Sequence, residues 1–471
     1  MKINPSLLSL IGNTPMLKLN CFNTGPCELY VKLESQNPGG SIKDRVGLAI
    51  IEDAEKSGAL KPGGTIVEAT AGNTGIGLAL IAALKGYRII LVIPDKMSRE
   101  KILHLEGLGA EIILTRSDVP EEHPEYYHHV AKRIVSETPG SFLANQFSNP
   151  ANPMIHRTTT GPEIWEQMGG DVDAVVAGVG SGGTLTGMAE FFKTKDRDVQ
   201  MVAADPEGSI VADAVTKGHF SYDGGSWLVE GVGEDFIPDN LNVELLDDAV
   251  VVSDKEAFST LQTLVREEGI LGGSSTGTLV AGAVKWCQRQ TKKKRVVTFI
   301  CDTGNKYLSK AFNKSWLQDN DLLDKDQQGN LSDLVNRRAD EGDMVSVKPS
   351  DTLMIAYNRM RASDISQIPV LDDDELIGVI DEEDILFSVK KDRSSFKDEV
   401  RACMVTNLDI LQAEASEDDL VGILTQGKVA IIYDGKKFIG FVTKVDLINH
   451  YRTRIDPVSY THLTLPTNSG V

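Results

Sequence analysis

Residues 37–45 read Asn-Pro-Gly-Gly-Ser-Ile-Lys-Asp-Arg, and this stretch places one lysine, Lys43, at the expected start of a helix. The Pro-Gly-Gly turn ends any preceding element. Apolar residues then recur at helical spacing until Ser57-Gly58, where we expect the helix to end. A helix N-terminus carries partial positive charge, which disfavours an ammonium and lowers the pKa of a lysine. Lys43 is therefore a candidate for a Schiff base with a carbonyl compound, although on this stretch alone a solvated surface lysine is the simpler interpretation.

The chain has 471 residues, which predicts three domains, or two domains and an appendage. A formal net charge of −20 argues against non-specific binding to nucleic acid, because the phosphates would be repelled. No apolar run is long enough to span a bilayer, and the start lacks a secretory cleavage pattern, so we expect no membrane partner. The five cysteines contain no C-x-x-C pair, and His123, His128 and His129 lie in a polar loop. We therefore expect reduced thiols of a cytoplasmic protein and no metal site.

Short apolar runs alternate with helical patterns between about residue 60 and residue 315. Because these runs are continuously apolar, they are typical of parallel strands covered on both faces, and the alternation predicts an α/β fold. The expected strands are residues 65–67, 88–93, 111–114, 174–179, 200–204, 250–252 and 296–300. The expected helices include residues 75–85, 184–193 and 253–268, the last opened by the capping box Ser253-x-x-Glu256. Ligands of such folds bind at the carboxyl ends of the strands.

A glycine-rich turn follows the expected strand 174–179 and opens a helix. Its residues are Gly180, Ser181, Gly182, Gly183 and Thr184. The backbone N–H groups of such a turn converge on an anion, and a phosphate ester fits there. The same turn satisfies the dinucleotide pattern G-x-G-x-x-G from Gly178 onward, and Asp205 ends the next strand, where a ribose-binding acid would lie. An NAD-dependent oxidoreductase therefore stays open at this point.

Two further turns offer polar groups in the same context of strand, turn and helix. After strand 65–67 come Thr70, Gly72, Asn73 and Thr74, whose hydroxyl, amide and backbone donors suit a substrate carboxylate. Asn73 is also long enough to reach a phenolic oxygen on a cofactor ring. The second turn, residues 272–277, contains Ser275, and Gln146 follows the apolar run 142–144 with an amide able to bind a carboxylate. Taken singly, each of these residues is explained as well by a helix cap or a turn.

The composition changes after residue 316. Residues 321–339 are rich in polar side chains and read as a linker. An internal repeat follows, in which the segment beginning at Gly378 recurs 62 residues later at Gly440. The repeat predicts two copies of one small α/β unit between residues 340 and 456. Residues 457–471 show no periodicity, and we expect an unstructured or non-native tail.

Taken in order, the motifs from Ile11-Gly-Asn-Thr-Pro15 to about residue 320 resemble the type II pyridoxal-phosphate β-family, and within it the cystathionine β-synthases. The resemblance covers roughly two-thirds of the chain. It implies a two-domain, parallel-sheet fold like that of the tryptophan synthase β subunit, with residues 1–320 as the catalytic core. A small mobile subdomain is expected at about residues 44–145, and pyridoxal 5'-phosphate is the implied cofactor.

The resemblance also assigns roles to the residues singled out above. Lys43 looks like the Schiff-base lysine and the general base, Asn73 like the partner of the ring hydroxyl, and Ser275 like the partner of the pyridine nitrogen. The turn from Gly180 to Thr184 looks like the phosphate cradle. The implied substrate-carboxylate site consists of Thr70, Ala71, Gly72, Asn73, Thr74 and Gln146.

The implied reaction is β-replacement on L-serine, or an activated serine, by L-homocysteine through an aminoacrylate, which gives L-cystathionine. Residues 205–209 and 230–238 are similar to the cystathionine β-synthase forms, whereas Ala71, Phe147 and Glu234 depart from the usual residues at their positions. A cysteine synthase that uses O-acetylserine or serine with sulfide therefore stays open. So do the NAD-dependent oxidoreductase and a catalytically silent ligand sensor. The chain begins at the core, without the haem-binding extension of animal enzymes, so we expect no haem.

The C-terminal repeat resembles a pair of CBS domains, modules that bind adenosine ligands between their two copies. By this resemblance the contacts are Asp384 in the first copy and Thr443 and Asp446 in the second. Asp381 replaces the hydroxyl residue of the first copy, so we expect one competent site at most, for S-adenosylmethionine or an adenine nucleotide. A purely structural pair is the alternative. The resemblance also implies a homodimer or a homotetramer.

Overall fold

A computed structural model describes residues 6–70, 72–95, 97, 99–116, 119, 123–195, 197–219, 225–323, 329–335, 337–339, 344–363, 365–373 and 375–454. Ala71 and the predicted tail, residues 457–471, lie outside this set. The chain divides into two compact units, Met1–Leu317 and Gln318–Val471. Within the described residues, no helix is sufficiently long and apolar to span a membrane.

The larger sheet of the first unit has six strands in the order β1-β2-β10-β7-β8-β9. Neighbouring strands are parallel, except that β1 runs antiparallel to β2. The strands are β1 (Met16–Lys18), β2 (Glu28–Leu33), β7 (Ala174–Ala177), β8 (Gln200–Pro206), β9 (Asp248–Val252) and β10 (Arg295–Ile300). Every residue of β7 is buried, as expected for a parallel strand covered on both faces.

The smaller sheet has four parallel strands in the order β5-β4-β3-β6. They are β3 (Thr65–Ala69), β4 (Arg88–Pro94), β5 (Glu111–Thr115) and β6 (Ser141–Leu143). The α/β fold with parallel sheets that the sequence predicts is therefore confirmed. Apart from β1, the strands of each sheet run the same way, so their carboxyl ends share one edge, where ligands of such folds bind.

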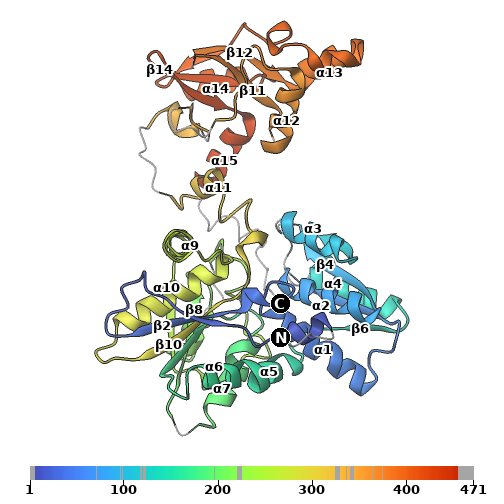
Figure 1. The fold of residues 1–471 in the computed structure, drawn as a ribbon, viewed down its shortest axis with the longest axis vertical. Helices are drawn as coiled ribbons and strands as arrows, with labels where there is room; N and C mark the ends of the chain where they lie inside the picture. The colour runs from blue at the N-terminus through green and yellow to red at the C-terminus, as the bar shows by residue number, and fades with distance from the viewer. Residues whose placement is uncertain are drawn as a thin grey trace, which may run out of the picture. The chain divides into compact units, whose positions relative to one another are not determined.

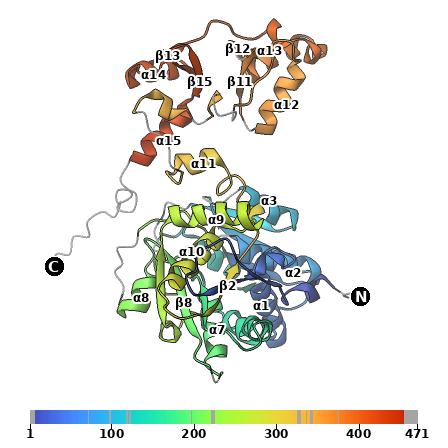
Figure 2. The same cartoon turned by 60° about the vertical axis from the view of Figure 1, so that its left-hand side comes forward.

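Helices cover both sheets. Figures 1 and 2 show α9 and α10 on one face of the larger sheet and α7 on the opposite face. The helices of this part of the chain are α1 (Lys43–Ser57), α2 (Asn73–Lys85), α3 (Arg99–Gly107), α4 (Tyr127–Glu137), α5 (Ala151–Ile155), α6 (Gly161–Gln167), α7 (Gly183–Phe192), α8 (Val211–Lys217), α9 (Asp254–Glu268), α10 (Ser274–Gln288) and α11 (Lys314–Asp319). Short 3-10 turns and one π-helical turn, His156–Thr160, complete the set.

The local sequence explains where these helices begin and end. The helix expected after Lys43 ends at Gly58, which adopts a left-handed conformation with φ of 76°. The predicted capping box of α9 forms between Ser253 and Glu256. Helix α2 begins at Asn73, two residues before the expected start, because the turn residues themselves enter the first helical turn.

Helices α1 and α2 pack against each other unusually closely. A Cβ added at Gly77 would lie 2.8 Å from the carbonyl oxygen of Lys43, and one added at Gly47 would lie 2.9 Å from the carbonyl carbon of Gly77. Only glycine permits this approach. Both helices bury apolar side chains in one core with the smaller sheet, among them Ile50 and Ile76. The position of Lys43 is therefore fixed by the core of the smaller sheet.

The second unit repeats one arrangement of strands and helix. Antiparallel β11 and β12 precede α13, and antiparallel β14 and β15 precede α15. Its elements are α12 (Leu353–Ser363), β11 (Gln367–Asp372), β12 (Glu375–Asp381), α13 (Glu382–Lys391), β13 (Ile410–Gln412), α14 (Glu417–Leu424), β14 (Ala430–Asp434), β15 (Lys437–Val442) and α15 (Lys444–Arg454). The internal repeat seen in the sequence thus corresponds to a structural repeat.

The end of the expected linker is part of this second unit. Residues Leu331–Leu334 form a 3-10 turn, and Leu331, Leu334 and Val335 are buried in one core with β14 and β15. Polar composition made residues 321–339 look uniformly unstructured, yet three apolar side chains at close spacing are enough to anchor this turn.

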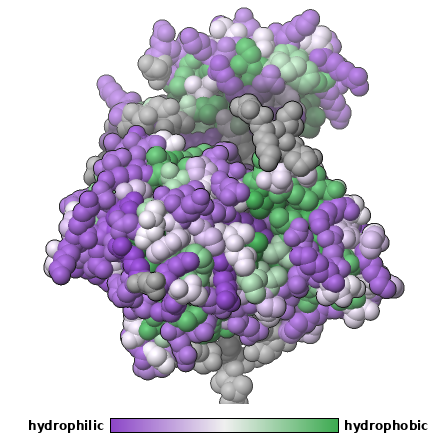
Figure 3. Space-filling view, turned by 60° about the horizontal axis from the view of Figure 1, so that its bottom comes forward, coloured by the Kyte–Doolittle hydropathy of each residue, from purple (hydrophilic) through white to green (hydrophobic). Residues whose placement is uncertain are grey.

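The surface of the protein agrees with its composition. Figure 3 shows polar and charged side chains over most of the visible face, with apolar side chains in smaller patches.

Candidate active site

Lys43 is the first residue of α1, and its backbone N–H donates to the Ser41 hydroxyl at 3.2 Å. Burial lowers the pKa of its amine, and the nearby Cys301, Glu234 and Asp302 oppose that shift. The position of Lys43 at a helix N-terminus predicts a lowered pKa, and in the structure the largest cause of the lowering is removal from water. In either case the neutral amine is favoured, which is the form that attacks a carbonyl carbon.

A buried cluster of charges holds the start of α1. The guanidinium of Arg45 pairs with Glu34 at 2.8 Å and with Glu163 at 2.6 Å, and Lys32 pairs with Glu163 at 2.8 Å. Burial pushes the pKa of Glu163 upward, but Arg45 and Lys32 hold it at about 2. Glu163 therefore stays ionised between Arg45 and Lys32, and Arg45 fixes α1 two residues beyond Lys43.

The turn Gly180–Thr184 follows β7 and opens α7. Gly182, the N-cap, has φ of 79°, and a Cβ there would lie 2.7 Å from the Cβ of Leu241. A Cβ at Gly180 would lie 2.9 Å from the carbonyl oxygen of Gly231. The turn thus presents backbone N–H groups with no side chains in the way, together with the hydroxyls of Ser181 and Thr184. This donor set fits a phosphate ester.

Two residues that sequence reasoning missed support this turn. The Asn152 side chain donates to the Ser181 hydroxyl at 2.9 Å and to the Gln146 carbonyl at 2.8 Å. The ring of His156 lies between Thr160, at 2.9 Å, and the hydroxyl of Thr184, at 3.2 Å. Burial lowers the pKa of His156 well below its ordinary value, so the imidazole is neutral. His156 lies in a π-helical turn, an irregularity often found at functional sites, but no local sequence pattern predicts this turn.

The turn after β3 and the residue after β6 meet. The hydroxyl of Thr74 donates to Oε1 of Gln146 at 2.5 Å, and the hydroxyl of Thr70 accepts the N–H of Gly72 at 3.2 Å. Thr70, Thr74 and Gln146 are all buried. The structure therefore brings together four of the residues expected to bind a carboxylate, at the N-terminus of α2.

Asn73 has partners that the sequence did not reveal. Its amide nitrogen donates to Asp302 at 2.7 Å, and its amide oxygen accepts from Lys306 at 2.9 Å. Asp302 also accepts the Tyr307 hydroxyl at 2.7 Å, while its other oxygen is buried with no partner among the described residues. Lys306 in addition donates to the carbonyl of Gly39, in the turn before Lys43. The sequence signal that could have identified Asp302 is its position directly after strand β10. Other site residues likewise follow directly after their strands.

Ser275 is buried in the first turn of α10. Its side chain interacts with the thiol of Cys301, whose pKa burial raises to about 12. Both groups are therefore uncharged near neutral pH. A hydroxyl in this position can hydrogen-bond a ring nitrogen without transferring a proton to it.

An ion-pair network joins helix α3 to the segments that contain Glu230 and Lys310. Lys101 contacts Glu230 at 2.5 Å and lies 4.5 Å from the ring centre of Tyr307, and Lys310 contacts Glu230 at 2.8 Å. A Cβ added at Gly72 would lie 2.7 Å from Cδ of Lys101. The Lys101 side chain therefore covers the turn after β3.

In the second unit, the three predicted ligand contacts take part in helix caps. Asp384 and Asp381 form a capping box at the start of α13. The Thr443 hydroxyl donates to Asp446 at 2.6 Å before α15. Burial, followed by the charge of Asp381, raises the pKa of Asp384. The two copies of the repeat are thus equivalent at these positions in structure as well as in sequence.

Comparison with known proteins places these features in context. Residues 7–302 match the family of pyridoxal-phosphate dependent enzymes, and residues 331–391 match the CBS domain. The cystathionine β-synthase of Dictyostelium discoideum is 35% identical over 468 residues, which cover 95% of this chain and 92% of the relative. That of Oryctolagus cuniculus is 36% identical over 479 residues, covering 96% and 86%. A hydrogen sulfide-producing enzyme from Fusobacterium nucleatum has a structure with a TM-score of 0.61 and 36% identity, covering 65% of this chain and 100% of its own.

Proposed function

The chain belongs to the pyridoxal-phosphate-dependent enzymes and, within them, to the cystathionine β-synthases, and from this premise we propose that it replaces the hydroxyl of L-serine with the thiol of L-homocysteine. The products are L-cystathionine and water. The observation that carries the proposal is a set of contacts among the turns that follow the strands. Asn152 links Gln146 to Ser181, His156 contacts Thr184, and the charge of Lys43 acts on the ring of His156. We infer that an amine, an anion cradle and a carboxylate-binding turn lie together.

Pyridoxal phosphate, when bound, supplies an electron sink that acidifies the Cα proton of an amino acid and lets its β-substituent leave. In our proposal Lys43 is the residue that would hold its aldehyde, and the turn Gly180–Thr184 would hold its phosphate. Asn73 would face the ring hydroxyl and Ser275 the ring nitrogen. The support for these roles is the donor set of each residue and the fit of the glycine turn to an anion.

The remaining residues act on the substrate. Thr70, Gly72, Thr74 and Gln146 bind the serine carboxylate at the N-terminus of α2, whose partial positive charge favours an anion. The amine of Lys43, free of the aldehyde once the substrate's own amine has taken its place, would take the proton from Cα and return it after the thiol has added. Burial lowers the pKa of this amine, so the unprotonated form that can accept a proton is more populated.

The experiment that tests the proposal supplies purified protein with serine and homocysteine and measures cystathionine by mass spectrometry. We expect a higher kcat/KM for this pair than for O-acetylserine with sulfide. Failure to form cystathionine, with cysteine formed from the second pair, would refute the proposed thiol.

A cysteine synthase or sulfide-metabolising enzyme is the second candidate. The structural neighbour that produces hydrogen sulfide favours it, because that whole chain superposes on the catalytic unit. The oxidoreductase reading of the glycine turn has less support, since Asp205 accepts the backbone N–H of Ala212 at 2.8 Å as part of a helix start. Membership of the pyridoxal-phosphate family explains the same turn as a phosphate cradle.

Four further properties belong to the proposal. We propose that an adenosine ligand such as S-adenosylmethionine binds the second unit near Thr443 and Asp446, which calorimetry would test. We also propose a homodimer or homotetramer, a cytoplasmic location and catalysis without haem. Size-exclusion chromatography with light scattering, cell fractionation and the visible spectrum of the purified protein test these in turn.

A further inference from the structure

One buried carboxylate at the edge of the site has no part in the chemistry described so far. Glu68 lies on β3, two residues before Thr70, and is 1% exposed. A carboxylate is rarely buried to this extent without a purpose, because removal of its charge from water is costly. Its contacts indicate what it does.

Both oxygens of Glu68 accept backbone N–H groups from the residues that follow β6. One accepts from Asn145 at 2.6 Å and the other from Gln146 at 3.3 Å. Asn145 has φ of 47°, a left-handed conformation that needs support from its surroundings. The carboxylate therefore holds a strained turn at the position where the chain presents Gln146.

Gln146 is fixed from several other directions as well. Its side-chain oxygen accepts from Thr74, and its carbonyl oxygen accepts from Asn152 and Asn240, both at 2.8 Å. Among these partners Glu68 is the one that ionises. A change in pH therefore acts on Gln146 through the charge of Glu68.

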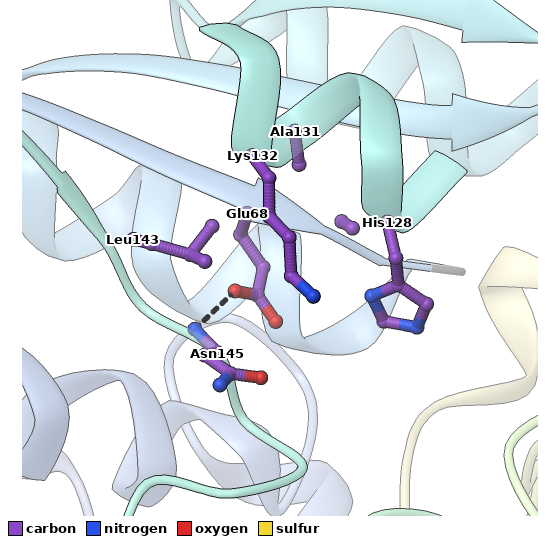
Figure 4. Close-up of a pocket in the computed structure, with 7 residues that line it drawn as sticks. Glu68, His128, Ala131, Lys132, Leu143 and Asn145 are labelled. Carbon is purple, nitrogen blue, oxygen red and sulfur yellow. Dashed lines mark hydrogen bonds between the residues drawn. The ribbon is translucent and has the colours of Figure 1, made fainter. Parts of the chain in front are cut away.

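Figure 4 shows the surroundings of the carboxylate, a cavity of about 20 Å³ that has room for a water molecule. The titratable groups that line it besides Glu68 are His128 and Lys132, both from α4; Leu143, Ala131 and Asn145 are uncharged. Burial lowers the pKa of His128 to about 4, so its ring is neutral, and Lys132 is exposed. Burial also raises the pKa of Glu68 to about 7, against the hydrogen bonds from Gln146 and Asn145.

We propose that Glu68 is a positioning residue whose carboxylate holds Gln146 in place for the substrate carboxylate, so that protonation of Glu68 weakens serine binding. The substrate named here rests on the proposed function. An ionised Glu68 offers an acceptor to each of the two N–H groups. A protonated one keeps its carbonyl oxygen as a full acceptor, but its hydroxyl oxygen is a weaker acceptor, so one of the two N–H groups is held less firmly and the turn loosens.

The first test is the pH dependence of catalysis. In the wild type we expect the KM for serine to rise as the pH falls below about 7, with kcat changed less. Glu68→Gln removes one acceptor at every pH, so its KM for serine should be about tenfold higher and should lose this pH dependence. Glu68→Asp keeps an ionisable acceptor and should recover the pH dependence in part.

Asp205 provides a matched control. It is also buried at the end of a parallel strand, its pKa is raised to about 6 by burial, and it accepts a backbone N–H, but from α8 rather than from the Gln146 turn. Asp205→Asn should lower thermal stability without raising the KM for serine. Equal KM effects of Asp205→Asn and Glu68→Gln, or a wild-type KM that is flat across neutral pH, would overturn the proposal.

A second readout does not depend on activity. Glu68 binds its proton more tightly in the folded chain, with a pKa of about 7, than in the unfolded chain, at its ordinary value near 4.5. Between these values the folded state holds more protons, so the free energy of unfolding falls as the pH rises. Glu68→Gln should flatten the melting temperature over this range. An unchanged slope would refute the placement of Glu68, whereas absence of any turnover with serine and homocysteine would instead refute the proposed function.

Discussion

At the scale of single residues, the chemistry depends on groups whose charge is set by burial. Lys43, His156 and Cys301 are all pushed toward their neutral forms by removal from water. With the Lys43 amine and the His156 ring both shifted toward neutrality, positive potential at the turn Gly180–Thr184 comes from the backbone N–H groups and the N-terminus of α7. This arrangement suits a cofactor that brings its own negative phosphate.

Replacement of the amine gives the most direct prediction. Lys43→Ala should lose the absorbance band of the lysine-bound cofactor and reduce kcat by about 10²–10⁴-fold, because both the covalent link and the general base disappear. Lys56→Ala, at the exposed opposite end of α1, should keep the band and the activity. A coloured, active Lys43→Ala protein would contradict the assignment.

His156 gives the second prediction. His156→Leu leaves the hydroxyls of Thr160 and Thr184 without their shared partner and should cost about 1–3 kcal/mol of stability. Because Thr184 belongs to the anion cradle, cofactor release on dilution should also quicken, which fluorescence of the freed cofactor would measure. His219→Leu, at an exposed site, should change neither quantity.

Some site residues can be predicted from local sequence, whereas others are defined by hydrogen-bond partners that lie far away along the chain. Lys43, Thr74 and the turn 180–184 stand after strands or at helix starts, so local patterns predicted them. Asp302 reaches Asn73 across 229 residues of sequence, and His156 reaches Thr184 from a π-helical turn. No periodicity encodes such pairings, because they result from the packing of separate elements.

At the scale of elements, the start of α7 offers a matched pair of glycines. Gly182 has φ of 79° and Leu241 close by, whereas Gly218 has φ of 69° at the end of α8 and nothing within 4 Å of an added Cβ. Gly218→Ala should cost only its backbone strain, about 1–2 kcal/mol.

Gly182→Ala adds a clash to the same strain, and the cradle must open to relieve it. We expect a further loss of about 1–3 kcal/mol in thermal unfolding and a cofactor that dialyses away. Equal behaviour of the two variants would show that the turn tolerates a side chain and does not grip an anion.

The strands and helices predicted between about residues 60 and 315 lie within a few residues of their observed bounds, whereas β1, β2 and one short 3-10 turn were not predicted. Continuous apolar runs identified the buried strands, and caps identified the ends of α1 and α9. The 3-10 turn Leu331–Leu334 was missed because its burial depends on β14 and β15, about 100 residues further along the chain.

At the scale of the whole molecule, the chain divides into two compact units, and the first contains the residues of the proposed catalytic site. A chain ending at residue 320 should bind the cofactor and retain β-replacement activity, because residues 1–317 form a compact unit of their own and the family match lies within residues 7–302. It should also lose any response to an adenosine ligand. Spectra and steady-state rates with and without S-adenosylmethionine would check this, and a colourless, unfolded product would contradict it.

The buried charges around Arg45 carry a consequence for how this chain varies among its relatives. Loss of one member leaves an uncompensated charge, at about 3–5 kcal/mol out of a total stability of about 5–15 kcal/mol. Lys32, Glu34, Arg45 and Glu163 should therefore be inherited as a block. Lineages that abandon one of the four are expected to show compensating exchanges at the others, and chimaeras that mix two such lineages should misfold at this quartet.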